Sequence, residues 1–218
     1  SYYGMKAILI VFMTSYLKMS ENDGLQHSED GKVRCWWPSN LPDYENYHDT
    51  EWGNPVVDDT RLFEKICLEG FQAGLSWLTI LRKRENYKKC FADFDPDLVA
   101  NFSQQYIGKI IKDPGIIRNK LKINSAIENA QKFLKIQSEC GSFSNYLWAF
   151  VDNKPILNNW EKSLQIPSKS DTSITVSNDL KKRGFKFVGP TIMYSLMQAC
   201  GLINDHGVKC VRREEIIN

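Results

Sequence analysis

The pattern of apolar and polar positions is helical along most of the chain. From Asp59 onward, apolar residues recur at spacings of three and four, the period of an amphipathic helix. No convincing run shows the alternation of a half-buried strand, so we predict an all-α fold. The expected helices cover residues 60–67, 77–91, 96–102, 104–113, about 117–136, 145–151, a segment ending at Gly184, and residues 190–200.

Capping residues divide these segments. Ser76, Asp95, Ser103 and Ser144 each precede an expected helix, where a side-chain oxygen can accept a hydrogen bond from a free amide of the first turn. Pro96 follows at the first position of its helix, where a missing N–H costs nothing. Residues 152–175 are rich in Asn, Ser, Lys and Pro and are predicted to form a connector.

Length and composition fit one medium domain, or two lobes that share a cleft. The chain has 218 residues, of which 42% are apolar. We expect an N-terminal extension over residues 1–34, to which an expression tag could contribute, a helical domain over 35–210 and a tail over 211–218.

The apolar run that begins at Met5 is too short to span a membrane, and no small-residue cleavage site follows it. Six dispersed cysteines favour a reducing compartment or metal binding over a disulfide framework, so we expect a cytoplasmic protein.

The charge alone does not identify a partner. A net charge of +2 neither requires nor excludes a polyanion. Basic side chains are concentrated in residues 82–84, 118–122 and 181–186. These stretches fit solvated helix faces as well as nucleic-acid contacts.

Two pairs of candidate metal ligands lie near the ends of the globular part. Twelve residues separate Cys35 from His48, and three separate His206 from Cys210. Two thiolates and two imidazoles complete a tetrahedral zinc site, which would be structural and would tie the N- and C-terminal segments together. The cysteines could equally be small buried apolar residues, and the spacing leaves both interpretations open.

The segment from Ile110 to Lys120 is predicted to form the end of one helix, a Pro-Gly turn and the start of a second helix. Amide groups at the start of the second helix could bind a phosphate, with Arg118 and Lys120 beside them. A routine turn between two helices is the alternative.

The stretch "LEGFQAGLSW", residues 68–77, raises a different question. A turn between helices needs a glycine and a capping serine, but it does not need Glu69, Gln72 or the indole of Trp77. Further aromatic residues lie upstream: Trp36, Trp37, Tyr44, Tyr47 and Trp52. Aromatic residues are often simply core. Beside an isolated carboxylate and amide, they favour a stacking pocket for a base extruded from a duplex.

Together these residues resemble the 3-methyladenine DNA glycosylase I family, a branch of the helix-hairpin-helix glycosylases. The resemblance covers roughly residues 34–210 and rests on the strings "YHDTEWG", "LFEKICLEGFQAGLSWLTILRKRENYKKCF", "GIIRNKLKI" and "KKRGFKFVGPTIMYSLMQACGLINDH". It implies a monomeric base-excision repair enzyme that acts on double-stranded DNA containing N3-methylated adenine. Such an enzyme hydrolyses the N-glycosidic bond, releases free 3-methyladenine and leaves an abasic site.

The resemblance also implies a role for each candidate residue. One structural Zn²⁺ would be held by Cys35, His48, His206 and Cys210. Glu69 would be the catalytic residue of a base pocket formed with Tyr47 and Trp77, surrounded by Trp37, Tyr44, Trp52 and Gln72. DNA contacts would come from Gly74 and Leu75, where the gap is filled, and from Gly115, Ile116, Ile117, Arg118 and Lys120.

One departure from the wider superfamily concerns the aspartate that stabilises the sugar cation. No Asp occurs between Pro114 and Val151, and the 3-methyladenine branch is known for lacking it. An adenine methylated at N3 already carries positive charge and leaves as a neutral base, so recognition becomes most of the catalysis.

Two other functions remain open. A bifunctional glycosylase with lyase activity would need an amine nucleophile, for which Lys120 or Lys122 could serve. A non-enzymatic, zinc-stapled DNA-binding module would leave Glu69 and the aromatic pocket unexplained.

Overall fold

The computed structural model describes residues 25–217, which divide into two compact units. Among the described residues, the first unit comprises 25–45, 158–166 and 205–217, and the second comprises 46–157 and 167–204. The apolar run that begins at Met5 lies outside the described residues. Within residues 25–217, no helix has the length and apolar character needed to cross a membrane.

The prediction of a mostly helical chain is confirmed. The second unit contains α3 (Asp59–Gln72), α4 (Trp77–Leu81), α5 (Arg84–Cys90), α6 (Pro96–Ala100), α7 (Gln104–Ile110), α8 (Lys120–Cys140), α9 (Phe143–Trp148), α10 (Asp171–Lys182) and α11 (Pro190–Ala199), with short 3-10 helices η1 (Ala92–Phe94) and η2 (Ala149–Val151). The first unit contains η3 (Ser163–Gln165) and α12 (Val211–Ile217). Helix α2 (Pro42–Thr50) begins in the first unit and ends in the second.

Two short strand pairs accompany the helices. β1 (Leu25–His27) pairs antiparallel with β2 (Val33–Cys35), and β3 (Ile156–Leu157) pairs parallel with β4 (Ile203–Asn204). With three and two residues per strand, none is long enough to show a recognisable alternation, which is why the sequence pattern did not reveal them.

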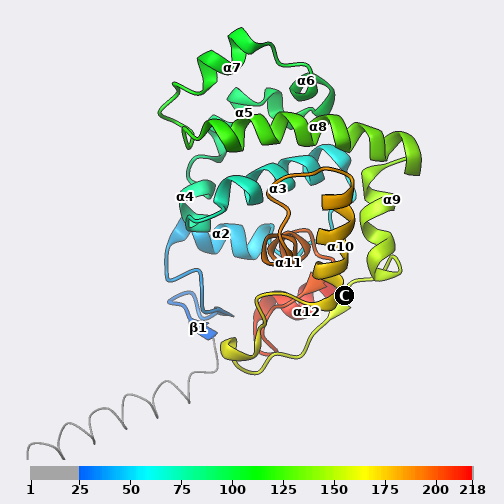
Figure 1. Ribbon diagram of the computed structural model, residues 1–218. Helices are drawn as coiled ribbons and strands as arrows, with labels where there is room; N and C mark the ends of the chain where they lie inside the picture. The colour runs from blue at the N-terminus through cyan, green and yellow to red at the C-terminus, as the bar shows by residue number, and fades with distance from the viewer. Residues whose placement is uncertain (1–24, 218) are drawn as a thin grey trace, which may run out of the picture. The chain divides into compact units, whose positions relative to one another are not determined.

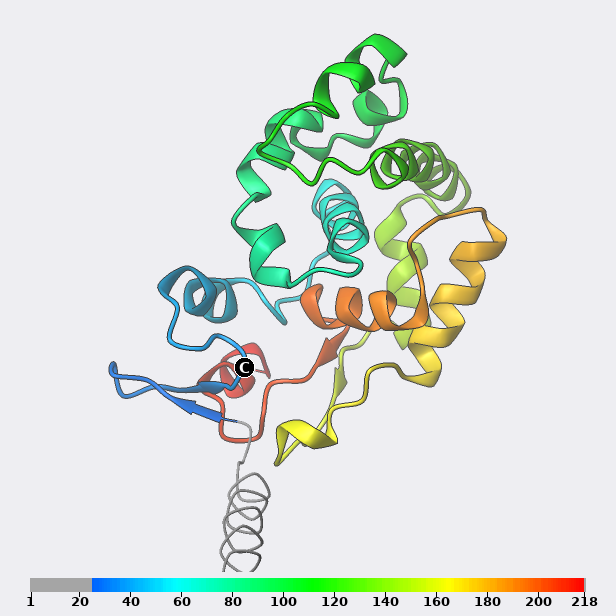
Figure 2. The ribbon, with the colours of Figure 1, turned by 60° about the vertical axis from the view of Figure 1, so that its left-hand side comes forward.

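Helix α3 is central to the core of the second unit. Leu62, Phe63 and Leu68 on this helix are fully buried, and each contributes roughly 1.5–3 kcal/mol by burial. Helix α8 lies between α6 and α3 (Figure 1). Helix α11 packs against both α3 and α10 (Figure 2). This packing holds the C-terminal end of α3 beside α11.

Three predicted caps are confirmed. The side chains of Ser76, Asp95 and Ser103 accept amide hydrogen bonds at the starts of α4, α6 and α7. The prediction for α9 was wrong by two residues, because Ser142 rather than Ser144 caps it. The expected connector contains the first turns of α10, which is capped by Ser170.

Other helix bounds also differ from the predictions. The expected helix 77–91 is two helices, because α4 ends at Leu81 and α5 begins at Arg84. Helix α8 begins at Lys120 rather than near Ile117, because Asn119 caps it by accepting the amide of Lys122. Helix α3 continues beyond Cys67 to Gln72.

Candidate functional site

Helix α3 positions Glu69 in the interior of the second unit. Because α3 runs to Gln72, Glu69 projects from a rigid helix rather than from a loop. Its side chain is buried, with 4% of the residue exposed. Burial raises the pKa of Glu69 to about 8, against the opposing charge of Lys65 one turn earlier. Both protonation states of this carboxyl are therefore accessible near neutral pH.

Glu69 lines a cavity at the C-terminal end of α3. The cavity has a volume of about 160 Å³ and is lined by Glu69, Gln72, Ala73, Gly74, Leu75, Thr191, Ile192 and Ser195. One wall is the α3–α4 segment and the other is the N-terminal half of α11. Gly74 adopts a φ of +78°, which an L side chain rarely adopts. Leu75, which follows this turn, is 41% exposed.

Two aromatic rings accompany the carboxylate. The ring centroids of Tyr47 and Trp77 are 5.4 Å apart. Burial and the charge of Glu69 raise the pKa of the Tyr47 phenol, as expected for neighbouring groups. The indole Nε1 of Trp77 is buried and has no hydrogen-bond partner among the described residues. A buried donor without a partner is costly in a native structure, and a ligand that supplies an acceptor would satisfy it.

The other predicted pocket aromatics form separate contacts. Trp37 and Tyr44 pair with each other in the first unit at a centroid distance of 4.7 Å. The ring of Trp52 lies nearly parallel to that of His48, with centroids 6.3 Å apart. Of the predicted pocket residues, the second unit thus joins Tyr47 with Trp77, and Gln72 with Glu69. The contribution of Trp37, Tyr44 and Trp52 to base binding stays a prediction.

Sequence reasoning missed a buried ion network beside this pocket. The Arg84 guanidinium donates to Glu64 at 2.7 Å and to Glu51 at 2.6 Å. The buried Lys65 ammonium also pairs with Glu51 and lies 5.0 Å from the Tyr47 ring centroid. Burial opposes ionisation of Glu51, but the hydrogen bonds from Arg84 and the charge of Lys65 lower its pKa to about 2. The only sequence signal was a cluster of charges at helical spacing, which usually indicates a solvated face.

The segment between α7 and α8 presents basic side chains to solvent. Arg118 and Lys120 are exposed, whereas Ile116 is buried. The amide of Gly115 donates to the Asp113 carboxylate at 2.7 Å, and the amide of Ile117 donates to the Tyr87 hydroxyl at 3.1 Å. These two predicted phosphate-binding amides therefore have partners within the protein.

The basic stretches are not uniformly solvated. Arg84 and Lys122 are buried. Arg183 pairs with Asp179 at 2.8 Å and with Glu139 at 2.6 Å, and Lys186 pairs with Glu128 at 2.7 Å. Arg84, Arg183 and Lys186 are thus paired with carboxylates within the chain.

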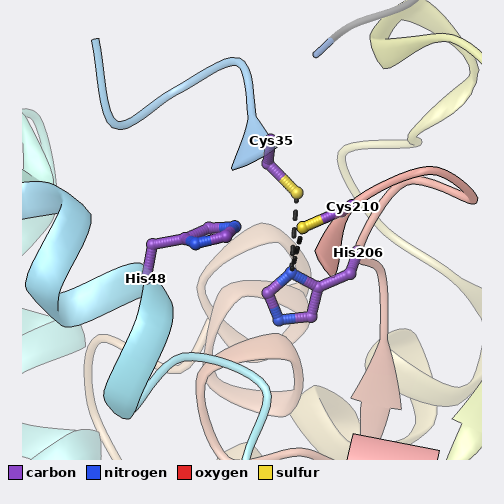
Figure 3. Close-up of side chains that lie close together, drawn as sticks. All are labelled: Cys35, His48, His206 and Cys210. Carbon is purple, nitrogen blue, oxygen red and sulfur yellow. Dashed lines mark hydrogen bonds between the residues drawn. The ribbon is translucent and has the colours of Figure 1, made fainter. Parts of the chain in front are cut away.

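The four candidate metal ligands are close together. Cys35, His48, His206 and Cys210 are all buried, and their ligand atoms lie within 4.8 Å of one another (Figure 3). The Nδ1 atom of His206 is 3.6 Å from the Cys35 sulfur and 3.4 Å from the Cys210 sulfur. The arrangement can hold a metal ion.

Local structure explains how these side chains are positioned. Cys35 ends β2, and the Cys210 amide bonds to the Gly207 carbonyl in a tight turn that brings Cys210 close to His206. The preceding Asp205 is fixed by hydrogen bonds from Asn158 and Trp160, each at 2.7 Å. The Nδ1 atom of His48, on α2, lies 2.8 Å from the Asp49 carboxylate, so Nε2 is the atom that would bind a metal.

Comparison with known proteins gives consistent matches over most of the chain. Residues 37–213 match the family model described as methyladenine glycosylase. DNA-3-methyladenine glycosylase 1 of Escherichia coli (strain K12) is 49% identical over 177 residues, which cover 81% of this chain and 95% of that protein. DNA-3-methyladenine glycosylase of Haemophilus influenzae (strain ATCC 51907 / DSM 11121 / KW20 / Rd) is 44% identical over 179 residues, covering 82% and 96%.

A solved structure shows the same fold. It is that of a 3-methyladenine DNA glycosylase I variant in complex with 3-methyladenine, with 39% sequence identity and a TM-score of 0.78. The alignment covers 80% of this chain and 94% of that chain.

Proposed function

This chain belongs to the methyladenine glycosylase family, and from that premise we propose how its residues excise 3-methyladenine from alkylated DNA. The reaction hydrolyses the N-glycosidic bond, releases the free base and leaves an abasic site for base-excision repair. The observation that carries the residue assignment is the buried carboxyl of Glu69, which lines a cavity and whose charge acts on Tyr47, the ring partner of Trp77.

Recognition of the base depends on charge. An adenine methylated at N3 is cationic in DNA, so an ionised Glu69 attracts it, and the base in turn favours ionisation of Glu69. The aromatic faces of Tyr47 and Trp77 add cation–π attraction of about 0.5–2 kcal/mol each. The partnerless Nε1 of Trp77 can donate to an acceptor on the base edge. These contacts select the cationic base over neutral adenine.

Cleavage then needs little acid assistance. The methylated base leaves as a neutral molecule, and the electron pair of the glycosidic bond goes with it. Water attacks the sugar carbon and loses its proton to solvent, which gives the abasic product. The pocket lowers the barrier by binding the extruded base while its charge is being lost.

We assign the hairpin between α7 and α8 to anchoring the DNA backbone, as in a helix-hairpin-helix element. Its exposed cations, Arg118 and Lys120, are suited to phosphates. The amides of Gly115 and Ile117 bond within the protein, so they shape the hairpin. The exposed Gly74–Leu75 turn is the part of the pocket wall suited to filling the gap left by the extruded base.

We assign one structural zinc ion to Cys35, His48, His206 and Cys210. A tetrahedral ion with Zn–S of about 2.3 Å and Zn–N of about 2.0 Å requires a sulfur–nitrogen separation of about 3.5 Å. The separations from His206 Nδ1 to the two sulfurs are 3.6 and 3.4 Å, which fit this geometry. Four protein ligands leave no position for water, so zinc would stabilise the fold and take no part in the reaction.

The decisive experiment incubates the protein with duplex DNA methylated by an alkylating agent and identifies the released bases by chromatography. Release of 3-methyladenine with formation of alkali-labile sites is expected. Glu69→Gln should weaken binding of free 3-methyladenine and slow its release from DNA, whereas the exposed control Glu85→Gln should behave as the parent. A folded parent that binds DNA but releases no base would instead support a binding module.

Borohydride trapping separates a monofunctional glycosylase from a lyase. The Lys122 ammonium donates to two backbone carbonyls, so it is poorly placed as a free nucleophile. We expect no covalent adduct on methylated DNA. A trapped adduct that disappears in Lys120→Met would instead identify a lyase.

A further inference from the structure

Lys122 is a buried cation with an unusual set of partners. It lies in the first turn of α8 and is 8% exposed. Its ammonium donates to the carbonyl of Phe71 at 2.8 Å and to that of Ala73 at 2.6 Å. Both carbonyls lie where α3 ends and the pocket wall begins. A lysine that reaches from one helix to the end of another links these two elements specifically.

This contact completes the C-terminus of α3. The last carbonyls of a helix lack partners within the helix. Here the amide of Ala73 bonds to Gly70 O at 3.3 Å and the amide of Leu75 to Gln72 O at 2.6 Å, whereas Phe71 O receives Lys122. The last turn of α3 has no basic residue of its own. Lys122 therefore supplies from α8 the positive charge that favours a helix C-terminus.

A second contact joins the same two regions. The Phe71 ring lies against the Tyr87 ring at a centroid distance of 4.4 Å. The Tyr87 hydroxyl accepts the amide of Ile117, in the hairpin, at 3.1 Å. The hairpin also leads directly into Lys122, whose amide bonds to the side chain of Asn119 at 3.1 Å. The α3 terminus is thus connected to the hairpin through both Phe71 and Lys122.

We propose that Lys122 is a positioning residue, which fixes the Gln72–Leu75 wall of the pocket at a set distance from the hairpin before α8. This inference rests on the proposed excision reaction and adds a requirement to it. The hairpin determines where the DNA backbone lies, and the wall determines where the extruded base and the gap lie. Since a displacement of about 1 Å can cost on the order of 10²-fold in rate, the separation between them must be held closely.

Loss of Lys122 should therefore separate two activities. The Lys122 ammonium donates to the carbonyls of Phe71 and Ala73 and not to the base-binding side chains of the pocket, so the affinity for the free base should change little. Excision from DNA requires the wall and the hairpin to lie at the correct separation, so the excision rate should fall. A purely structural role would instead lower both activities together.

The test compares the full-length parent with Lys122→Met and with Lys135→Met, a matched control at an exposed position of the same helix. Three quantities are measured: the single-turnover excision rate at saturating methylated DNA, the Kd for free 3-methyladenine, and the Tm. For Lys122→Met we expect an excision rate at least about tenfold lower, a Kd within about twofold, and a lower Tm. Lys135→Met should match the parent in rate and Kd.

Several outcomes would overturn the proposal. One is an unchanged excision rate in folded Lys122→Met, and another is an equal loss of base affinity and rate. If Lys122→Met does not fold, Lys122→Gln, which keeps one donor, is compared in the same way. In the parent itself, amide hydrogen exchange at Leu75 should be slow, and unprotected exchange would also overturn it. A parent that releases no 3-methyladenine refutes the proposed function instead, while the exchange result still shows whether the Gln72–Leu75 wall is held in place.

Discussion

Replacing Glu69 by Gln should change stability in the variant's favour as pH rises, and it should make the protein less able to bind the base. Burial raises the pKa of Glu69 to about 8 from an ordinary value of 4.5. The folded protein therefore binds a proton that the unfolded chain has lost between these two values. The contribution of Glu69 to stability is fully present below pH 4.5, decreases as pH rises, and reaches its minimum above pH 8.

The magnitude follows from the size of the pKa shift. Each unit corresponds to about 1.4 kcal/mol, so at pH 7 an ionisable Glu69 costs about 3 kcal/mol relative to its contribution at low pH. Gln cannot ionise and avoids this cost. Its buried amide brings a penalty of roughly 1–3 kcal/mol of its own, but this penalty does not vary with pH. The slope against pH therefore tests the reasoning better than the value at one pH.

The assay is urea unfolding of the parent and Glu69→Gln between pH 5.5 and 9, at equal zinc content. The free energy of unfolding of the variant minus that of the parent should rise by about 1.4 kcal/mol per pH unit up to about pH 7.5 and become constant above pH 8. The difference for the exposed control Glu85→Gln should stay flat. A flat difference for Glu69→Gln would show that the carboxyl ionises with an ordinary pKa in the folded protein and would refute the reasoning.

Three further predictions concern the remaining candidate residues. Trp77→Ala should weaken binding of free 3-methyladenine by roughly 1–3 kcal/mol in calorimetry, as expected when one stacking aromatic is lost. Unaltered binding would show that Trp77 does not contact the base. Metal analysis of the parent should find about one zinc per chain, and Cys210→Ser should lower both zinc content and Tm, so a metal-free parent never exposed to chelator would refute the site. The double substitution Arg118→Ala, Lys120→Ala should weaken DNA binding to a similar degree across sequences and flatten its salt dependence. Unchanged binding would indicate that another basic stretch, such as residues 181–186, contacts the DNA backbone instead.

The sequence determined the local structure that short-range chemistry controls. Helical periodicity indicated the mostly helical fold, and Ser76, Asp95 and Ser103 cap the helices that follow them, because a cap depends on residues only two or three positions away. The residue types of Cys35, His48, His206 and Cys210 indicated a metal site. Their closeness could not be derived from spacing, because it depends on how β2, α2 and the 205–210 turn are brought together.

Tertiary structure decided which polar residues are buried. Arg84 belongs to a basic stretch that fits a solvated helix face by its sequence, yet it is buried and pairs with Glu51 and Glu64 from distant parts of the sequence. The sequence indicated that Lys122 is one cation of a basic cluster or a nucleophile. In the structure its ammonium instead donates to the carbonyls of Phe71 and Ala73, about fifty residues earlier in the chain. Each of these outcomes depends on a partner far along the chain, and a charge can be buried only where the fold brings its partner to it.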